Sequence, residues 1–173
     1  MSELFEIEAV FQTAVVAIGE PGERVFYLQV IGDGQSINLK VEKEQMVALG
    51  QGTYELLLHL GLQELLQLLV SGAPELGQPA EPIVADPPKF SVGSIAIGFD
   101  EVRGQVMLEC EEFGEETEPS RLRIWLGPEQ LVDLAVQGLA VAAKGRPLCQ
   151  MCGLPMEPEG HVCPATNGHR AGI

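Results

Sequence analysis

The residues best suited to chemistry gather near the end of the sequence, in the stretch RPLCQMCGLPMEPEGHVCPATNGH, residues 146–169. Thiolates and imidazoles are the usual ligands of zinc, and a structural zinc site takes four of them in a tetrahedron. The pattern Cys-x2-Cys-x8-His-x-Cys therefore predicts a zinc site. The stretch holds three of the four cysteines and two of the three histidines: Cys149, Cys152, Cys163, His161 and His169.

The spacing of these residues suits a single ion. The glycine after Cys152 lets the backbone turn back, so that amide N–H groups can face the sulfurs. His161 and Cys163 lie two residues apart, and on an extended segment such side chains point the same way. We predict Cys149, Cys152, His161 and Cys163 as the ligands. His161 closes the shorter loop, but His169 remains the alternative to it because loop-closure entropy changes slowly with length.

Four ligands favour structural over catalytic zinc, because a catalytic zinc keeps one position open for water. Zinc deaminases place Pro before the first cysteine and use an upstream His-x-Glu. Here Leu148 precedes Cys149, and Gly61 stands two residues after His59, where the deaminases have Glu. A redox Cys-x2-Cys leads into a helix after a strand, whereas here Gly-Leu-Pro follows the pair. The sequence shows no recognisable catalytic constellation, which favours a non-enzymatic role and leaves an enzyme as the alternative.

A tail of about 25 residues buries too little apolar surface to fold alone, so metal binding must supply the missing free energy.

The rest of the chain shows an internal repeat. FQTAVVAIG (11–19) resembles FSVGSIAIG (90–98), and INLKVEKEQMVALGQG (37–52) resembles LRIWLGPEQLVDLAVQG (122–138). Each half is predicted to form three strands and then a helix.

The fold class we predict is α+β: two duplicated β-β-β-α modules with a mainly antiparallel sheet, followed by a C-terminal zinc knuckle. If the modules are related, Ile18 should superpose on Ile97, and Gln45 on Gln130. The expected boundaries are a first module at 1–70, a Pro-rich linker at 71–89, a second module at 90–145 and the zinc-knuckle tail at 146–173.

The segment YELLLHLGLQELLQLLVSG (54–72) carries leucine on nearly every side of a helix. Its polar residues and the absence of flanking Lys or Arg argue against a membrane span. We expect a helix over 54–70 that is buried all round, either under the linker or in a homodimer.

Three other features are predicted to be structural. Cys110 and Trp125 lie in apolar strand patterns, so both are expected in the core. The acidic loop 111–119 is expected to be a solvated hairpin tip. A carboxylate metal site is the alternative there, but no histidine stands nearby to complete it.

The chain is strongly acidic, with 25 Asp and Glu against 10 Lys and Arg and a net charge of −15. Such a surface repels phosphate backbones and anionic lipids, which disfavours nucleic-acid and membrane binding. The segment MSELFEIEAV is acidic and lacks the basic region of a signal peptide. We therefore expect a cytoplasmic protein with reduced cysteines.

Several stretches together resemble the bacterial domain-of-unknown-function 3090 family: GEPGERVFYLQV, SINLKVEKEQMVAL, FSVGSIAIGFD and the cysteine tail. The family is similar in its F-Y-L-Q opening and its C-P-x-C-G-x-P-x-x-P-x-G-H-x-C-P end. This chain departs from it at Gln150, where a proline would stand, and in its very apolar leucine-rich helix. All four candidate ligands match. The resemblance implies a kinase-like and a histidine-phosphatase-like protein as pathway neighbours.

Two functions are consistent with these features. The first is an interaction or adaptor protein in which structural zinc holds the tail. The second is an enzyme with a small-molecule site in the groove between the two modules, where duplicated folds often place one. A flat apolar patch would favour the first function, and a deep pocket with convergent polar groups the second.

Overall fold

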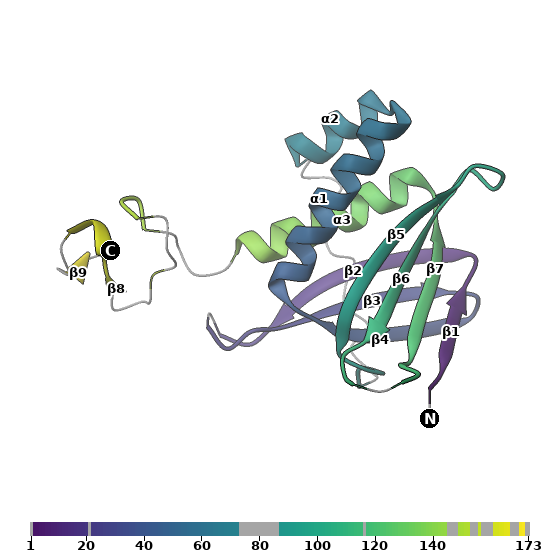
Figure 1. The fold of residues 1–173 in the computed structure, drawn as a ribbon, viewed down its shortest axis with the longest axis horizontal. Coiled ribbons are helices and arrows are strands. Elements are labelled where there is room, and N and C mark those ends of the chain that lie inside the picture. Colours follow the sequence, from purple (N-terminus) through teal and green to yellow (C-terminus); the bar gives the residue numbers. More distant parts are fainter. Residues whose placement is uncertain are drawn as a thin grey trace.

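The computed structural model describes residues 2–20, 22–72, 87–115, 117–144, 149–152, 156, 161–166 and 170–171. The order of its elements is strands, helices, strands, helix and a short tail (Figure 1). The first half contains β1 (Leu4–Ile7), β2 (Val10–Ile18), β3 (Val25–Gly32), β4 (Gln35–Val41), α1 (Lys43–Leu60) and α2 (Gln63–Ser71). The second half contains β5 (Val92–Asp100), β6 (Gln105–Glu112), β7 (Arg121–Leu126) and α3 (Pro128–Ala143).

The strands form two main sheets, which confirms the α+β class with mostly antiparallel pairing. Strands β2, β3 and β4 form one antiparallel sheet in that order. The other sheet has the order β1-β7-β6-β5, antiparallel except where β1 runs parallel to β7. The Pro128 at the start of α3 suits a first helical turn, where the missing N–H costs nothing.

The two halves share one order of elements, with three antiparallel strands followed by a helix. Cross-strand register aligns Val15, Leu28 and Leu39 in one sheet, and Ile97, Leu108 and Ile124 in the other. Val15 therefore occupies the place equivalent to Ile97, and the expected superposition of Ile18 on Ile97 is wrong by three residues. The loop after β2 and the loop after β5 differ in length, and this difference shifted the sequence alignment of the two halves. Common origin of the halves stays a prediction.

Gln45 and Gln130 hold equivalent places at the starts of α1 and α3. The side-chain oxygen of Gln45 accepts a hydrogen bond from Glu42 N at 2.8 Å, and that of Gln130 accepts one from Gly127 N at 2.8 Å. Each amide nitrogen then reaches the other half. Gln45 Nε2 donates to Val92 O at 2.8 Å, and Gln130 Nε2 donates to Val10 O at 2.9 Å. These bonds tie each helix start to the first strand of the opposite half.

Each half also extends a sheet of the other, the first half with strand β1 and the second with a short segment just before β5. β1 pairs with β7, from Leu4 beside Arg121 to Ile7 beside Ile124. Residues just before β5 run parallel to β4, with Lys89 N donating to Asn38 O at 2.8 Å and Lys40 N donating to Phe90 O at 3.0 Å. Of the expected linker 71–89, residues 73–86 lie outside the described residues. The module and linker boundaries remain predictions.

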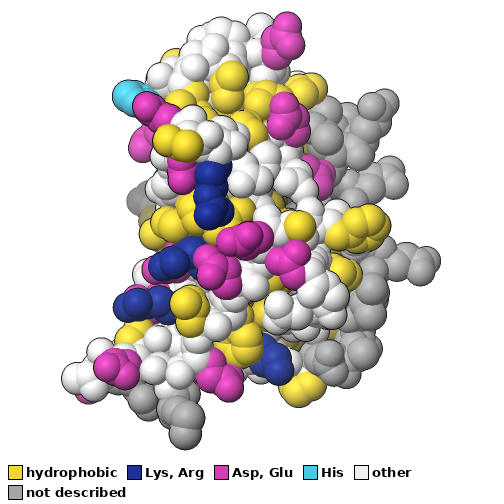
Figure 2. All heavy atoms as spheres, turned by 90° about the vertical axis from the view of Figure 1, so that its right-hand side faces the viewer, with side chains coloured by type: hydrophobic (Ala, Val, Ile, Leu, Met, Phe, Trp, Pro, Cys, Tyr) yellow, Lys and Arg dark blue, Asp and Glu magenta, His cyan; other side chains and the backbone are white. Residues whose placement is uncertain are grey.

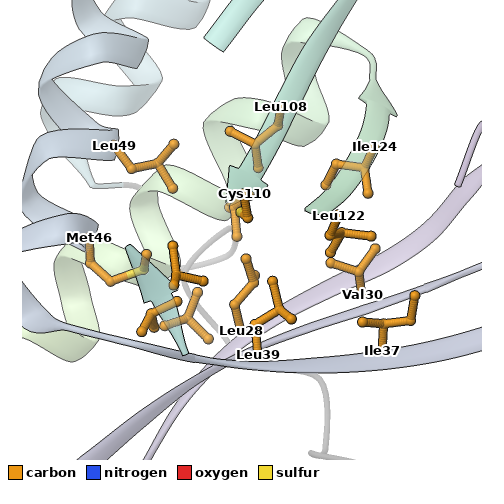
Figure 3. Packing of buried hydrophobic residues seen from close by; sticks show 14 of the residues in the cluster. Leu28, Val30, Ile37, Leu39, Met46, Leu49, Leu108, Cys110, Leu122 and Ile124 are labelled. Atoms are coloured by element: carbon orange, nitrogen blue, oxygen red, sulfur yellow. The ribbon is translucent and has the colours of Figure 1, made fainter. Parts of the chain in front are cut away.

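One hydrophobic core lies between the sheets and under both long helices (Figure 3). It includes Leu28 and Leu39 from one sheet, Leu108 from the other, and Met46 from α1, all no more than 1% exposed. Cys110 is 1% exposed and points into this core, as predicted. Burial, with a smaller contribution from Glu109, raises the pKa of its thiol to about 12.

Trp125 does not lie in the core, contrary to expectation. Alternation along β7 buries Leu122, Ile124 and Leu126, so Trp125 falls on the outer face of the sheet. There the Arg103 guanidinium lies 4.2 Å from its ring centroid, which stabilises the half-buried indole by a cation–π contact. Figure 2 shows basic and acidic side chains interleaved on the face of the molecule that lies to the right in Figure 1.

The leucine-rich segment forms two helices rather than one over 54–70. α1 already begins at Lys43, and it ends where Gly61 adopts the left-handed conformation with φ 72°. α2 follows from Gln63. Within the single chain Leu57 is 0% exposed, but Leu58 is 52% exposed and Val70 is 70% exposed. The segment is therefore not buried all round by its own chain, and a homodimer through it stays a prediction.

Candidate metal centre

Short elements of the tail position the four candidate ligands. Cys149 and Cys152 flank a turn. His161 begins β8 (His161–Val162), which pairs antiparallel with β9 (Arg170–Ala171). Cys163 follows β8 directly and precedes the 3-10 turn η1 (Pro164–Thr166). The alternation along this extended segment brings His161 and Cys163 to the same side, as their spacing predicts.

The ligand atoms converge to the dimensions of a tetrahedral site. One atom from each of Cys149, Cys152, His161 and Cys163 lies within 4.8 Å of all the others. Zinc bonds of about 2.3 Å to sulfur and about 2.0–2.1 Å to nitrogen give a tetrahedron with edges of about 3.8 Å between sulfurs and about 3.6 Å from sulfur to nitrogen. The Cys149 and Cys163 sulfurs are 3.8 Å apart, and Cys152 Sγ lies 3.7 Å from His161 Nε2. Both distances fit this geometry.

The same distances exclude a disulfide between Cys149 and Cys163, because bonded sulfurs lie about 2.05 Å apart. Both residues are buried, at 4% and 0% exposure. Together with Met156, at 9%, and the half-buried Cys152, they form a small hydrophobic cluster separate from the main core. A cluster of this size is too small to fold a chain segment unaided, so it fits a unit organised around a metal.

The backbone around the first pair favours a thiolate. Hydrogen bonds from the backbone of Cys152 and then Met151, followed by the His161 side chain, lower the pKa of Cys149 from 9.0 to about 6. Such N–H groups aimed at sulfur stabilise the charged form, which is the form that binds metal. The turn after Cys149 therefore prepares a ligand as well as placing it.

The structure brings together all four residues that the spacing singled out, and they could hold a metal ion. Three sulfurs and one imidazole are a donor set that zinc accepts readily. His169, the alternative to His161, lies outside the described residues. The choice between the two histidines therefore stays a prediction.

A family model matches most of the chain. Residues 5–163 match the model of a family described as a protein of unknown function, DUF3090. The chain belongs to the DUF3090 family. The DUF3090 match ends at Cys163, so it spans every one of the four clustered ligands. No curated protein and no solved structure matches the chain.

The acidic loop 111–119 shows ion pairing rather than a gathered set of carboxylates. Glu111 accepts from Arg121 at 3.0 Å, and the Glu112 carboxylate accepts from Ser120 N at 3.1 Å. Hydrogen bonds from Ser120 lower the pKa of Glu112. Among the described residues, the tail is where metal-ligating side chains cluster. In the described part of the chain, no helix combines the length and apolar character needed to cross a membrane.

Proposed function

We propose that this protein is a zinc-binding interaction protein, an adaptor, whose tail is folded by a structural zinc ion. The observation that carries the proposal is the convergence of Cys149, Cys152, His161 and Cys163 within 4.8 Å. Three thiolates and one neutral imidazole around Zn²⁺ give a site charge near −1 and leave no ligand position for water. Such a site holds the chain together and does not activate a nucleophile.

Exposed apolar side chains on the helices support the interaction role. Tyr54 and Leu58 on α1 are 42% and 52% exposed, and Val70 on α2 is 70% exposed. Exposed apolar surface of this kind marks contact sites more often than catalytic ones. The proposed partners are a second copy of this chain or the kinase-like and phosphatase-like neighbours that the family resemblance suggests. We propose the cytoplasm as the location because it keeps thiols reduced.

Zinc content of the purified protein under reducing conditions tests the metal site. We expect about one equivalent per chain, since structural sites hold zinc with roughly 10–16 kcal/mol. Cys152→Ser should release the metal, whereas Cys110→Ala, which removes the one cysteine outside the tail, should keep it. Less than about half an equivalent in the unmodified protein would end the zinc proposal.

The two histidines are compared in the same assay. His161→Ala should lose far more zinc than His169→Ala, because His161 Nε2 already lies 3.7 Å from Cys152 Sγ. Equal zinc loss from both variants would leave the zinc proposal standing, but it would overturn the choice of His161 as the fourth ligand. Far-ultraviolet circular dichroism and urea unfolding of Cys152→Ser should remain close to those of the unmodified protein, because the main core contains none of the tail residues.

A further inference from the structure

A groove of about 540 Å³ lies between α1 and the outer edge of β5. β5 is the last strand in the sheet order β1-β7-β6-β5, so this edge has no neighbouring strand among the described residues. One face of α1, from Gln45 through Gly52 to His59, forms one wall. Gly93, Ser94, Ile95 and Ile97 of β5 form the other.

The equivalent place in the other half is filled by a side chain. There α3 lies beside the edge of β2, and Gln137, 2% exposed, reaches between them. Its Oε1 accepts from Val15 N at 3.1 Å, and its Nε2 donates to Thr13 O at 3.2 Å. A carboxamide that offers one acceptor and one donor to a strand edge imitates the peptide group of a neighbouring strand.

The groove exists because the matching residue of α1 is a glycine. Gln137 stands seven residues after Gln130, and Gly52 stands seven after Gln45. Register likewise places Ile97 where Val15 stands. A Cβ on Gly52 would lie 3.1 Å from Ile97 Cδ1, so the tip of the Ile97 side chain packs against the helix at this point. One half thus carries a built-in hydrogen-bonding partner for its strand edge, whereas the glycine at the matching helix position of the other half has no side chain to supply one.

The backbone groups of Ile95 and Ile97 point into the groove. Opposed residues of an antiparallel pair alternate between bonding to each other and bonding outward. Glu112 N donates away from β5, to Ser120 O at 2.9 Å, and its partner Val92 accepts from Gln45 at the outer edge. The partners of Ile95 and Ile97 lie two and four residues along β6 from Glu112, so the same alternation applies to them. Their N–H and C=O groups therefore face α1.

We propose that this groove binds an extended peptide segment of a partner protein, which pairs with Ile95 O and Ile97 N in the place that Gln137 fills in the other half. This is strand addition, in which main-chain bonds supply affinity and side chains supply selectivity. The proposal rests on the interaction role above and is independent of the zinc site.

The dimensions and charge of the groove define the peptide. From Gln45 to His59 the α1 wall is about 21 Å long. This length matches about six residues of an extended chain and exceeds the length of a single amide ligand. Leu49, Leu56 and Ile95 supply apolar surface, and Glu55 supplies a negative charge in a chain of net charge −15. The favoured segment therefore alternates apolar residues with Lys or Arg.

The probe is an array of capped eight-residue peptides in which apolar residues alternate with randomised positions that include Lys, Arg, Ser and Glu. The tightest binder is measured by calorimetry. We expect Gly52→Gln to weaken it more than tenfold, because the new carboxamide occupies the strand edge. Gln51→Ala, on the neighbouring exposed position of α1, should change nothing. Cys152→Ser should also bind normally, which separates this result from the fate of the zinc proposal.

Single N-methylation along the peptide tests strand pairing without altering the protein. Losses should alternate, because only every second N–H of an added strand faces β5. Absence of any binder below about 1 mM, affinity unchanged by Gly52→Gln, or losses without alternation would each overturn the proposal. The proposal would also be overturned if the protein dimerises and Gly52→Gln abolishes that dimerisation, because a second copy of the chain would then be the occupant.

Discussion

Gln137 offers the sharpest test of how the two halves are joined. Its carboxamide is buried between α3 and β2, and it bonds to Val15 N, to Thr13 O and to Asp133 Oδ2 at 3.0 Å. Replacing it with methionine keeps a flexible side chain of similar length but removes both polar atoms. The N–H of Val15 and the C=O of Thr13 are then left facing an apolar group.

The expected loss of stability follows from these two backbone groups that lose their hydrogen-bond partner. Val15 is 0% exposed and Thr13 is 6% exposed, so water cannot readily replace the lost partner. Each buried backbone group left without a partner costs about 1–3 kcal/mol, and the extra apolar contact of methionine returns about 1 kcal/mol. For two such groups we therefore expect Gln137→Met to lower the free energy of unfolding by about 1–5 kcal/mol.

Urea unfolding followed by the fluorescence of the single tryptophan, Trp125, measures this cost. Gln51→Met is the matched control, since Gln51 is exposed on α1 and its replacement should change stability by no more than about 0.5 kcal/mol. A loss below about 1 kcal/mol for Gln137→Met would show that the β2 edge does not depend on this side chain. It would also remove the template on which the peptide groove was inferred.

Two further predictions concern the tail and the sheet corner. Because hydrogen bonds lower the pKa of Cys149 to about 6, its thiolate is already present at pH 7 in the metal-free protein. Bound zinc competes with protons for this thiolate, so zinc should stay bound at pH 7 and its release should require a pH below about 6. A colorimetric zinc indicator that showed half release above pH 7 would contradict this. Gly32→Ala should destabilise the protein by about 1–3 kcal/mol, because a Cβ would overlap the Ala9 backbone oxygen. Gly34→Ala is the control: it has open space around it and should cost only about 1 kcal/mol, through its φ of 72°. Equal thermal unfolding shifts for the two variants would refute the steric argument.

Local patterns in the sequence were sufficient to predict the ligand cluster and most strands. Cys149 and Cys152, like His161 and Cys163, are close in sequence, so their spacing alone constrains where their side chains go. The alternation in β7 likewise identifies Leu122 and Ile124 as buried. It also places Trp125 on the opposite face, but the general preference of tryptophan for the core outweighed that alternation in the prediction, and Arg103 covers the ring from a distant turn.

Pairings between distant segments were beyond the reach of sequence patterns. The parallel contact of β1 with β7 joins residues 117 positions apart, such as Leu4 and Arg121. Nothing in the four residues of β1 states which strand edge they will find. The role of Gln137 is beyond sequence patterns for a similar reason, because its hydrogen-bond partners lie on a strand more than 120 residues earlier.

The exchange of short strands between the halves has a consequence for how the chain folds. During synthesis β1 is made long before β7, so its place in the sheet exists only after residues 121–124 have been made. Residues 89–91 complete the edge of β4 in the same delayed manner. Contacts over such sequence separations slow folding, because the loop entropy is lost before the contact forms. We therefore expect the edge of β4 to stay uncovered during synthesis until residues 89–91 have been made, and the pairing of β1 with β7 to form late in folding.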